Sequence, residues 1–192
     1  MVSLATTPGE MIKKYLSGDR NGFQKPFAFL FIATTVYAIL LHFMQSAPET
    51  FNAGTSTHER FIANADYLES KYYSWLHMGF LPVYGFISLI IFRKQPYNYA
   101  EWMVVCCYVL SFILFLLIPY QIITYFFDFG NATNFWIQML IVIFYSVFAF
   151  SGLLRIKNLW SKTVLSIVWA AAIFTFYMYM VQGIAWLITV RS

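Results

Sequence analysis

The sequence predicts an all-α protein, an integral membrane bundle of five transmembrane helices with an N-terminal interfacial helix. Of its 192 residues, 60% are apolar and 10% are charged, against about 45–50% and about 25% in soluble domains. A chain this short leaves much of its surface exposed, so an apolar excess of this size requires lipid around it. Five long apolar runs also contain no Lys, Arg, Asp or Glu, and such runs are typical of membrane spans.

Residues 1–25 are expected to lie in the cytoplasm and to contain a short helix that starts at Pro8. Thr7, Pro8 and Glu10 have the spacing of an N-cap residue, a first-turn proline and a capping-box glutamate. The side chains expected to form an apolar face, with Lys13 and Lys14 beside it, are Met11, Ile12, Tyr15 and Leu16. This pattern predicts a helix lying on anionic lipid headgroups; an ordinary solvated helix is the alternative.

The membrane domain is expected over residues 26–192. Its first span, 26–44, has 19 residues, which nearly matches the roughly 30 Å hydrocarbon core at 1.5 Å per residue. No small-residue cleavage site follows it, so it is expected to be an uncleaved anchor and not a signal peptide. The remaining spans are expected at 75–92, 102–127, 135–154 and 164–190. Bends are expected at Gly79, Pro82, Gly85 and Pro119.

The loop 45–74 is the only sizeable segment expected outside the membrane, on the extracytoplasmic side. It is expected to be partly helical, with Ser56 or Thr57 as the cap. A single apolar stripe then leads into the second span through Phe61, Ala65, Leu68 and Tyr72. We expect this stripe to pack on the outer ends of the protein's own helices.

The positions of the positive charges predict the orientation of the chain. Nine Lys and Arg residues lie before the first span or in the 93–101 and 155–163 loops, whereas three lie in the remaining connections and at the C-terminus. Cytoplasmic segments carry the excess of positive charge, so the N-terminus is predicted to be cytoplasmic and the C-terminus extracytoplasmic. The same cations are too dispersed for a nucleic-acid surface, and the expected partner is the lipid bilayer, with its anionic headgroups.

Three glutamines are the candidate intramembrane polar cluster. Gln121, Gln138 and Gln182 fall toward the same leaflet in this topology, where they are predicted to line a vestibule or bind a solute, with Asp128 above them. The alternative is hydrogen bonding between helices, worth about 0.6 kcal/mol for each bond.

No catalytic, cofactor-binding or metal-binding residue is predicted. His42 and His77 lie near the outer surface with Asp128, but none of the zinc-binding spacings is present. Hydrolase and nucleotide-binding motifs and paired intramembrane carboxylates are also missing, which argues against an enzyme and against proton-coupled transport. Cys106 and Cys107 are adjacent in an apolar run and are interpreted as packing residues.

Two stretches resemble an uncharacterised bacterial membrane family, domain of unknown function 3667. The first runs from Thr7 to Arg20 (TPGEMIKKYLSGDR) and continues with FQKP at 23–26; the second is FRK at 92–94 followed by YNYAE at 97–101. The family's usual cysteine-rich zinc ribbon is absent here, and Trp102 stands where the family commonly has His. The resemblance implies a bacterial inner-membrane location and no particular reaction. Five spans with a cytoplasmic N-terminus are also similar to the Yip1 group, at the level of architecture only.

Both stretches fall on the cytoplasmic side in this topology and define a cytoplasmic patch. Its residues are Arg20, Lys25, Arg93, Lys94, Asn98 and Glu101. Asn98 and Glu101 have the spacing of an N-cap and a capping-box glutamate, which is the leading interpretation. The alternative is a site for an anionic headgroup or a nucleotide.

The predicted function is that of a non-enzymatic, homo-oligomeric multi-pass protein that forms a pore or permeation path or acts as a membrane effector. Nearly all of the chain is expected to lie in the bilayer, and five short helices are not expected to enclose a pathway without partners. The alternative is a membrane scaffold or assembly factor that recruits a partner through its cytoplasmic face. A lipid-modifying enzyme would need a site at the outer His42, His77 and Asp128.

Overall fold

The computed structural model describes residues 6–44, 56–127 and 131–191, and in this part of the chain the secondary structure is entirely helical. The helices are α2 (Pro8–Leu16), α3 (Pro26–Met44), α4 (Thr57–Ile91), α5 (Tyr99–Phe126), α6 (Asn131–Leu153) and α7 (Leu159–Arg191). The five longer ones each contain a segment long and apolar enough to cross a membrane. The predicted all-helical membrane fold with five spans is therefore confirmed.

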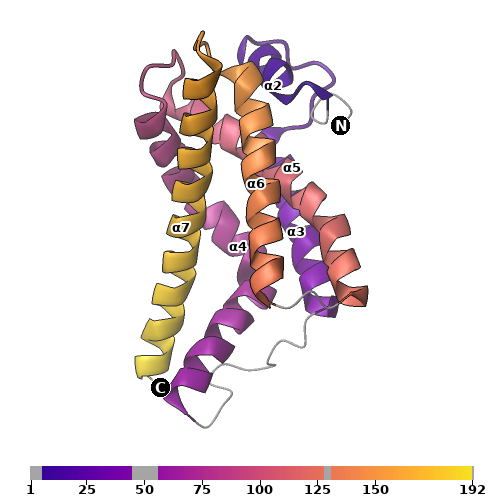
Figure 1. The fold of residues 1–192 in the computed structure, drawn as a ribbon, viewed down its shortest axis with the longest axis vertical. Coiled ribbons are helices and arrows are strands. Elements are labelled where there is room, and N and C mark those ends of the chain that lie inside the picture. The colour runs from indigo at the N-terminus through magenta and orange to yellow at the C-terminus, as the bar shows by residue number, and fades with distance from the viewer. Residues whose placement is uncertain (1–5, 45–55, 128–130, 192) are drawn as a thin grey trace.

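The five long helices form one bundle, and α2 lies across one end of it (Figure 1). Within the bundle α4 packs against α3, α5 and α7, and α6 packs against α5 and α7. The connections at 92–98 and 154–158 lie at the same end as α2, whereas the C-terminus lies at the opposite end (Figure 1). We call these the α2 end and the C-terminal end.

Helix α2 begins at Pro8 as predicted, but it differs from the prediction in two ways. Thr7 makes no side-chain capping hydrogen bond, so the predicted capping box is wrong. Met11 and Ile12 are buried in the core, where α2 packs on α6, so the face predicted to rest on lipid contacts the protein instead. The close approach is possible because Gly9 meets the backbone of α6 at Gly152.

Helix α4 begins in the predicted outer loop and continues without a break into the second span. Ser56 is its cap: the Glu59 N–H donates to Ser56 Oγ and the Ser56 N–H donates to a Glu59 carboxylate oxygen, both at 3.2 Å. Further along α4, Leu68 packs against Val181 and Ala185 of α7, as the apolar stripe predicts. The stripe's last residue, Tyr72, is an exception and is exposed.

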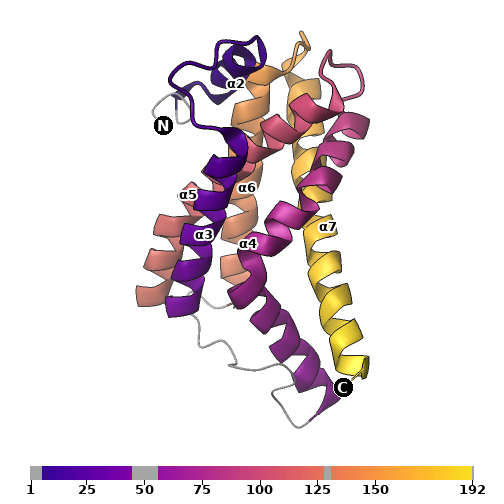
Figure 2. The ribbon, with the colours of Figure 1, turned by 180° about the vertical axis from the view of Figure 1, so that it is seen from behind.

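Pro82 and Gly85, both expected to bend the second span, have different roles in the structure. Figure 2 shows α4 changing direction along its length, and Pro82 lies inside that helix, where a proline removes a backbone hydrogen bond. Gly85 instead allows close packing, because a Cβ there would lie 2.6 Å from the side chain of Met103 on α5. This glycine therefore brings α4 and α5 together.

Candidate functional site: a cavity inside the bundle

A cavity of about 410 Å³ lies between the five spanning helices, and every one of them contributes to its wall. It runs from the middle of the bundle, at Tyr84 and Trp169, toward the C-terminal end, at Glu69 and Asn134. Most of the polar lining residues lie toward the C-terminal end: Tyr37, Glu69, Tyr73, Gln121, Asn134 and Gln138. The volume is within the range of about 300–1,000 Å³ found for small-molecule sites.

The cavity brings together two of the three predicted glutamines. Gln121 and Gln138 both line it, whereas Gln182 is exposed on α7 and does not. Gln121 Nε2 donates a hydrogen bond of 2.9 Å to the Tyr37 hydroxyl of α3. Gln121 therefore fits both interpretations of the glutamines: it makes a hydrogen bond between two helices, and it presents a polar group to the cavity.

Seven rings besides that of His77 contribute to the cavity wall. They belong to Tyr37, Tyr73, Tyr84, Phe135, Trp169, Phe174 and Tyr177. The Tyr37 and Tyr73 ring centroids lie 5.0 Å apart, and the Tyr73 and Tyr177 centroids lie 6.2 Å apart. The hydroxyls of Tyr84 and Tyr177 are buried and have no hydrogen-bond partner within the described residues. The wall thus combines aromatic faces with unused polar groups.

His77 belongs to this wall and does not lie at an outer site with His42. Its ring stacks on Tyr73, with centroids 4.3 Å apart, and its Nδ1 lies 3.2 Å from the Tyr73 carbonyl oxygen. His42 is exposed at the end of α3, and Asp128 lies outside the described residues. Among the residues that are described, no group of three His, Cys, Asp or Glu side chains is placed to hold a metal ion.

Glu69 is the cavity residue that the sequence analysis missed. It lies on α4 just before the spanning segment and lines the cavity with Tyr73 and His77, one and two turns further along. Burial and the nearby negative charge of Asp66 raise the pKa of the Glu69 carboxyl to about 7. Within the described ranges no Lys, Arg or His lies within ion-pair distance of it. The spacing of residues 69, 73 and 77 on one helical face was the signal available in the sequence.

The cavity is closed toward the α2 end by a layer of packed aromatic rings. The Trp169 ring lies 4.8 Å from that of Phe150, and Phe92 lies 4.8 Å from Phe150 and 4.9 Å from Trp102. Trp169 Nε1 also donates a 2.7 Å hydrogen bond to Ser88 Oγ. These four rings, which we call the aromatic layer, are buried, so the cavity does not continue through them.

The cytoplasmic patch predicted from the sequence is only partly assembled. Arg20, Lys25, Arg93 and Lys94 are all exposed. Asn98 and Glu101 form the predicted capping box: the Glu101 N–H donates to Asn98 Oδ1 at 2.9 Å, and the Asn98 N–H donates to Glu101 Oε2 at 2.7 Å. Their role in starting α5 is therefore confirmed.

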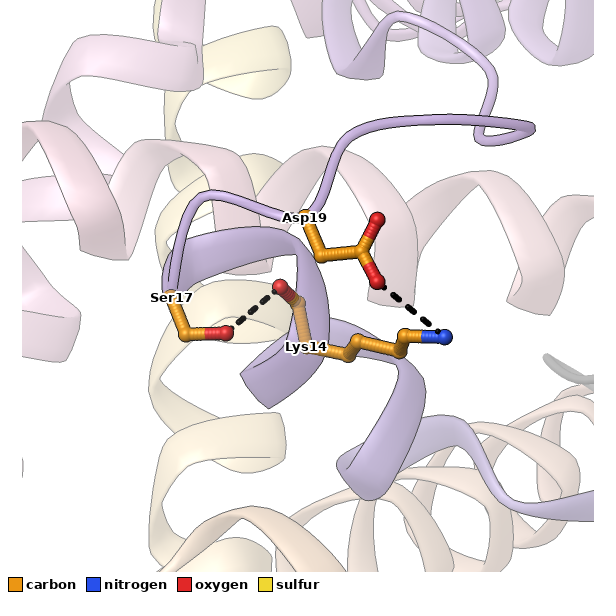
Figure 3. Close-up of polar contacts among 3 residues, drawn as sticks. All are labelled: Lys14, Ser17 and Asp19. Carbon is orange, nitrogen blue, oxygen red and sulfur yellow. Dashed lines mark hydrogen bonds and ion pairs between the residues drawn. The ribbon is translucent and has the colours of Figure 1, made fainter.

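A groove of about 360 Å³ at the α2 end gathers a different set of cations. Lys13 and Lys14 of α2 line it with Arg155, and Glu101 is its one member from the predicted patch. Figure 3 shows how the end of α2 is held: Lys14 Nζ lies 3.2 Å from Asp19 Oδ2, and Ser17 Oγ donates to the Lys14 carbonyl oxygen at 2.8 Å. Gly18 follows with a φ of 101°, as is common just after a helix end.

A family model described as "Protein of unknown function (DUF3667)" matches residues 1–38, which contain α2 and the first part of α3. The resemblance seen in the first stretch is thus supported, whereas the 92–101 stretch lies outside the matched residues. No curated protein and no solved structure matches the chain.

Proposed function

We propose that this protein is a non-enzymatic membrane protein that binds a small solute between its spanning helices and provides that solute with a path across the membrane. The cavity carries the proposal, because it is lined by all five spanning helices and has polar groups toward one end. Polar groups at membrane depth are costly unless they serve a pathway or bind one another. One chain forms the cavity alone, and the homo-oligomer expected from the sequence stays a prediction.

In this proposal the aromatic layer is the closed gate of the path. A solute that enters from the C-terminal end reaches Trp169 and stops there, since the rings beyond it are packed. Passage requires these rings to move apart, and Pro82 inside α4 supplies a place where that helix can bend. Alternating closure of this kind is common in proteins that move solutes through a helical bundle.

Filling the cavity is the direct test. Leu117 is buried and lines the cavity, whereas its neighbour Leu116 is exposed on the outside of α5. We expect Leu117→Trp to reduce solute flux by at least about tenfold, because the indole occupies the path, and Leu116→Trp to leave it unchanged. The measurement is light scattering from proteoliposomes swelling in a panel of small neutral and charged solutes, with an equal amount of reconstituted protein in each sample.

Two outcomes of the swelling assay would contradict the permeation proposal. If the unmodified protein admits no solute of the panel while eluting as a folded particle, the permeation proposal is wrong. The scaffold alternative would then be favoured, with the groove lined by Lys13, Lys14 and Arg155 as its docking surface. An equal loss of flux in both Trp variants would also count against a path through the cavity.

The proposal includes the predicted orientation, with the C-terminal end outside the cell and the α2 end in the cytoplasm of a bacterial cell. It rests on the excess of Lys and Arg in the segments of the α2 end. A periplasm-active reporter is expected to work when fused after Ser192, and a cytoplasm-active reporter when inserted near Gln95. A cytoplasmic signal from the Ser192 fusion would reverse the orientation, and the cavity would then open inward.

A further inference from the structure

We propose that the solute held in the cavity is a monovalent organic cation, an amine or quaternary ammonium with an apolar body, bound between the Glu69 carboxylate and the surrounding tyrosine rings. This inference rests on the proposed function and names its class of solute. It is carried by the shape and chemistry of the cavity wall, and it concerns a residue that lies outside every apolar run of the sequence.

The aromatic part of the wall suits a cation of this kind. Tyr37, Tyr73 and Tyr177 come from α3, α4 and α7, and all three line the cavity together with Glu69. The face of an aromatic ring attracts a positive charge, and several rings together form the cages that bind quaternary ammonium groups. The deeper lining, Leu110, Ile113 and Ile173, is apolar and fits the organic body of such a ligand.

Glu69 makes a cation a better occupant than an anion or a neutral molecule. Its carboxylate is half-buried and has no ion-pair partner within the described residues, and removing a charge from water without a partner is costly. A bound cation supplies that partner, whereas an anion is repelled. A metal ion is a poorer fit, because calcium or magnesium takes at least six oxygen ligands and Glu69 is the one carboxylate that the described residues contribute to the cavity wall.

The same carboxyl makes the binding of the cation depend on pH. Among the described residues, the titratable groups that line the cavity with Glu69 are Tyr73, His77 and Tyr84 on α4, Tyr37 on α3 and Tyr177 on α7, and α5 and α6 contribute the amides of Gln121, Asn134 and Gln138. Asp66 lies three residues before Glu69 on α4, and its negative charge acts on the carboxyl. With a pKa of about 7, the Glu69 carboxyl is mostly ionised at pH 8 and mostly protonated at pH 6. A cation that binds the ionised form displaces the proton into solution. Its affinity is therefore expected to fall about tenfold from pH 8 to pH 6.

The test is calorimetric titration of the full-length protein in detergent with benzyltrimethylammonium. We expect saturable binding at pH 8 that weakens about tenfold at pH 6, with Glu69→Gln weakening the pH 8 affinity by at least tenfold and removing most of the pH dependence. His77 is buried in the same wall, and a pH dependence in Glu69→Gln as large as that of the unmodified protein would count against the Glu69 carboxyl as the titrating group. The control is Glu10→Gln, because Glu10 is exposed on α2 and does not line the cavity; it is expected to keep both the affinity measured at pH 8 and the pH dependence.

A neutral comparator separates this inference from the proposed function. Neopentylbenzene has the shape of benzyltrimethylammonium but no charge. If it competes as well as the cation, and Glu69→Gln changes nothing, the cavity binds solutes and the cation specificity is wrong. If neither compound binds to protein that elutes as a folded particle, the inference is overturned, and the swelling assay with the Leu117 variant decides permeation separately. Recovery of pH 8 binding in Glu69→Asp above the Glu69→Gln level would support a role for the negative charge, whereas no recovery would count against it.

Discussion

Replacing Gly9 with Ala is expected to displace α2 from the bundle and to destabilise the protein by about 3 kcal/mol or more. A Cβ at this position would lie 2.4 Å from the Leu153 backbone nitrogen and 2.6 Å from the Ala149 carbonyl oxygen. Both are backbone atoms of α6, which cannot rotate away as a side chain can. Overpacking of a core typically costs about 1–3 kcal/mol, and here the shift also exposes Met11 and Ile12, which are buried.

Gly79→Ala is the matched control for this substitution. No atom lies within 4 Å of a Cβ built at Gly79 of α4, and alanine favours a helix by about 0.8–1.0 kcal/mol over glycine. The two Gly→Ala changes are therefore expected to shift the melting temperature in opposite directions, measured by tryptophan fluorescence in detergent. Gly9→Ala is also expected to make the 17–25 segment more sensitive to limited proteolysis. An unchanged melting temperature in Gly9→Ala would show that α2 does not depend on this contact.

The spans could be predicted from the sequence because their signal is local. A charge-free apolar run indicates that lipid surrounds the helix, whichever helices pack beside it. The caps at Ser56 and Asn98 depend only on residues three positions away. Helix α2 shows the limit of such signals. The same apolar face fits a lipid surface or the side of α6, and only the approach of Gly9 to Gly152 decides between them.

The site was harder to predict because it depends on contacts between helices. Gln121 and Gln138 attracted attention as polar residues inside apolar runs, and the cavity does include them. Glu69 lies outside the predicted span, where a carboxylate is ordinary, and its helical spacing with Tyr73 and His77 does not by itself indicate a cavity. Its significance appears only when α4 is seen to be continuous from Thr57 and to place residue 69 in the cavity wall with the tyrosines of α3 and α7. The chain therefore does carry an acidic group beside its membrane cavity.

Glu69 is expected to make the stability of the unliganded protein depend on pH. Burial and Asp66 raise its pKa from 4.5 to about 7 in the folded protein, so the folded state holds the proton more tightly than the unfolded state. The associated stability is present below about pH 4.5 and is lost as the pH rises through 7. A shift of this size corresponds to about 3 kcal/mol between the two limits, or roughly 6–12 °C in melting temperature for a chain of this length.

Glu69→Gln is expected to remove this dependence, because the amide stays neutral throughout. Between pH 5 and pH 8.5 the melting temperature of the unmodified protein is expected to fall relative to that of the variant, so that the variant is the more stable of the two at pH 8.5. Glu10→Gln, at an exposed carboxyl on α2, is the control and is expected to follow the unmodified protein. Parallel curves for the Glu69 variant and the unmodified protein would mean that the Glu69 carboxyl is fully solvated, and the cavity would then lack the buried charge that selects a cation.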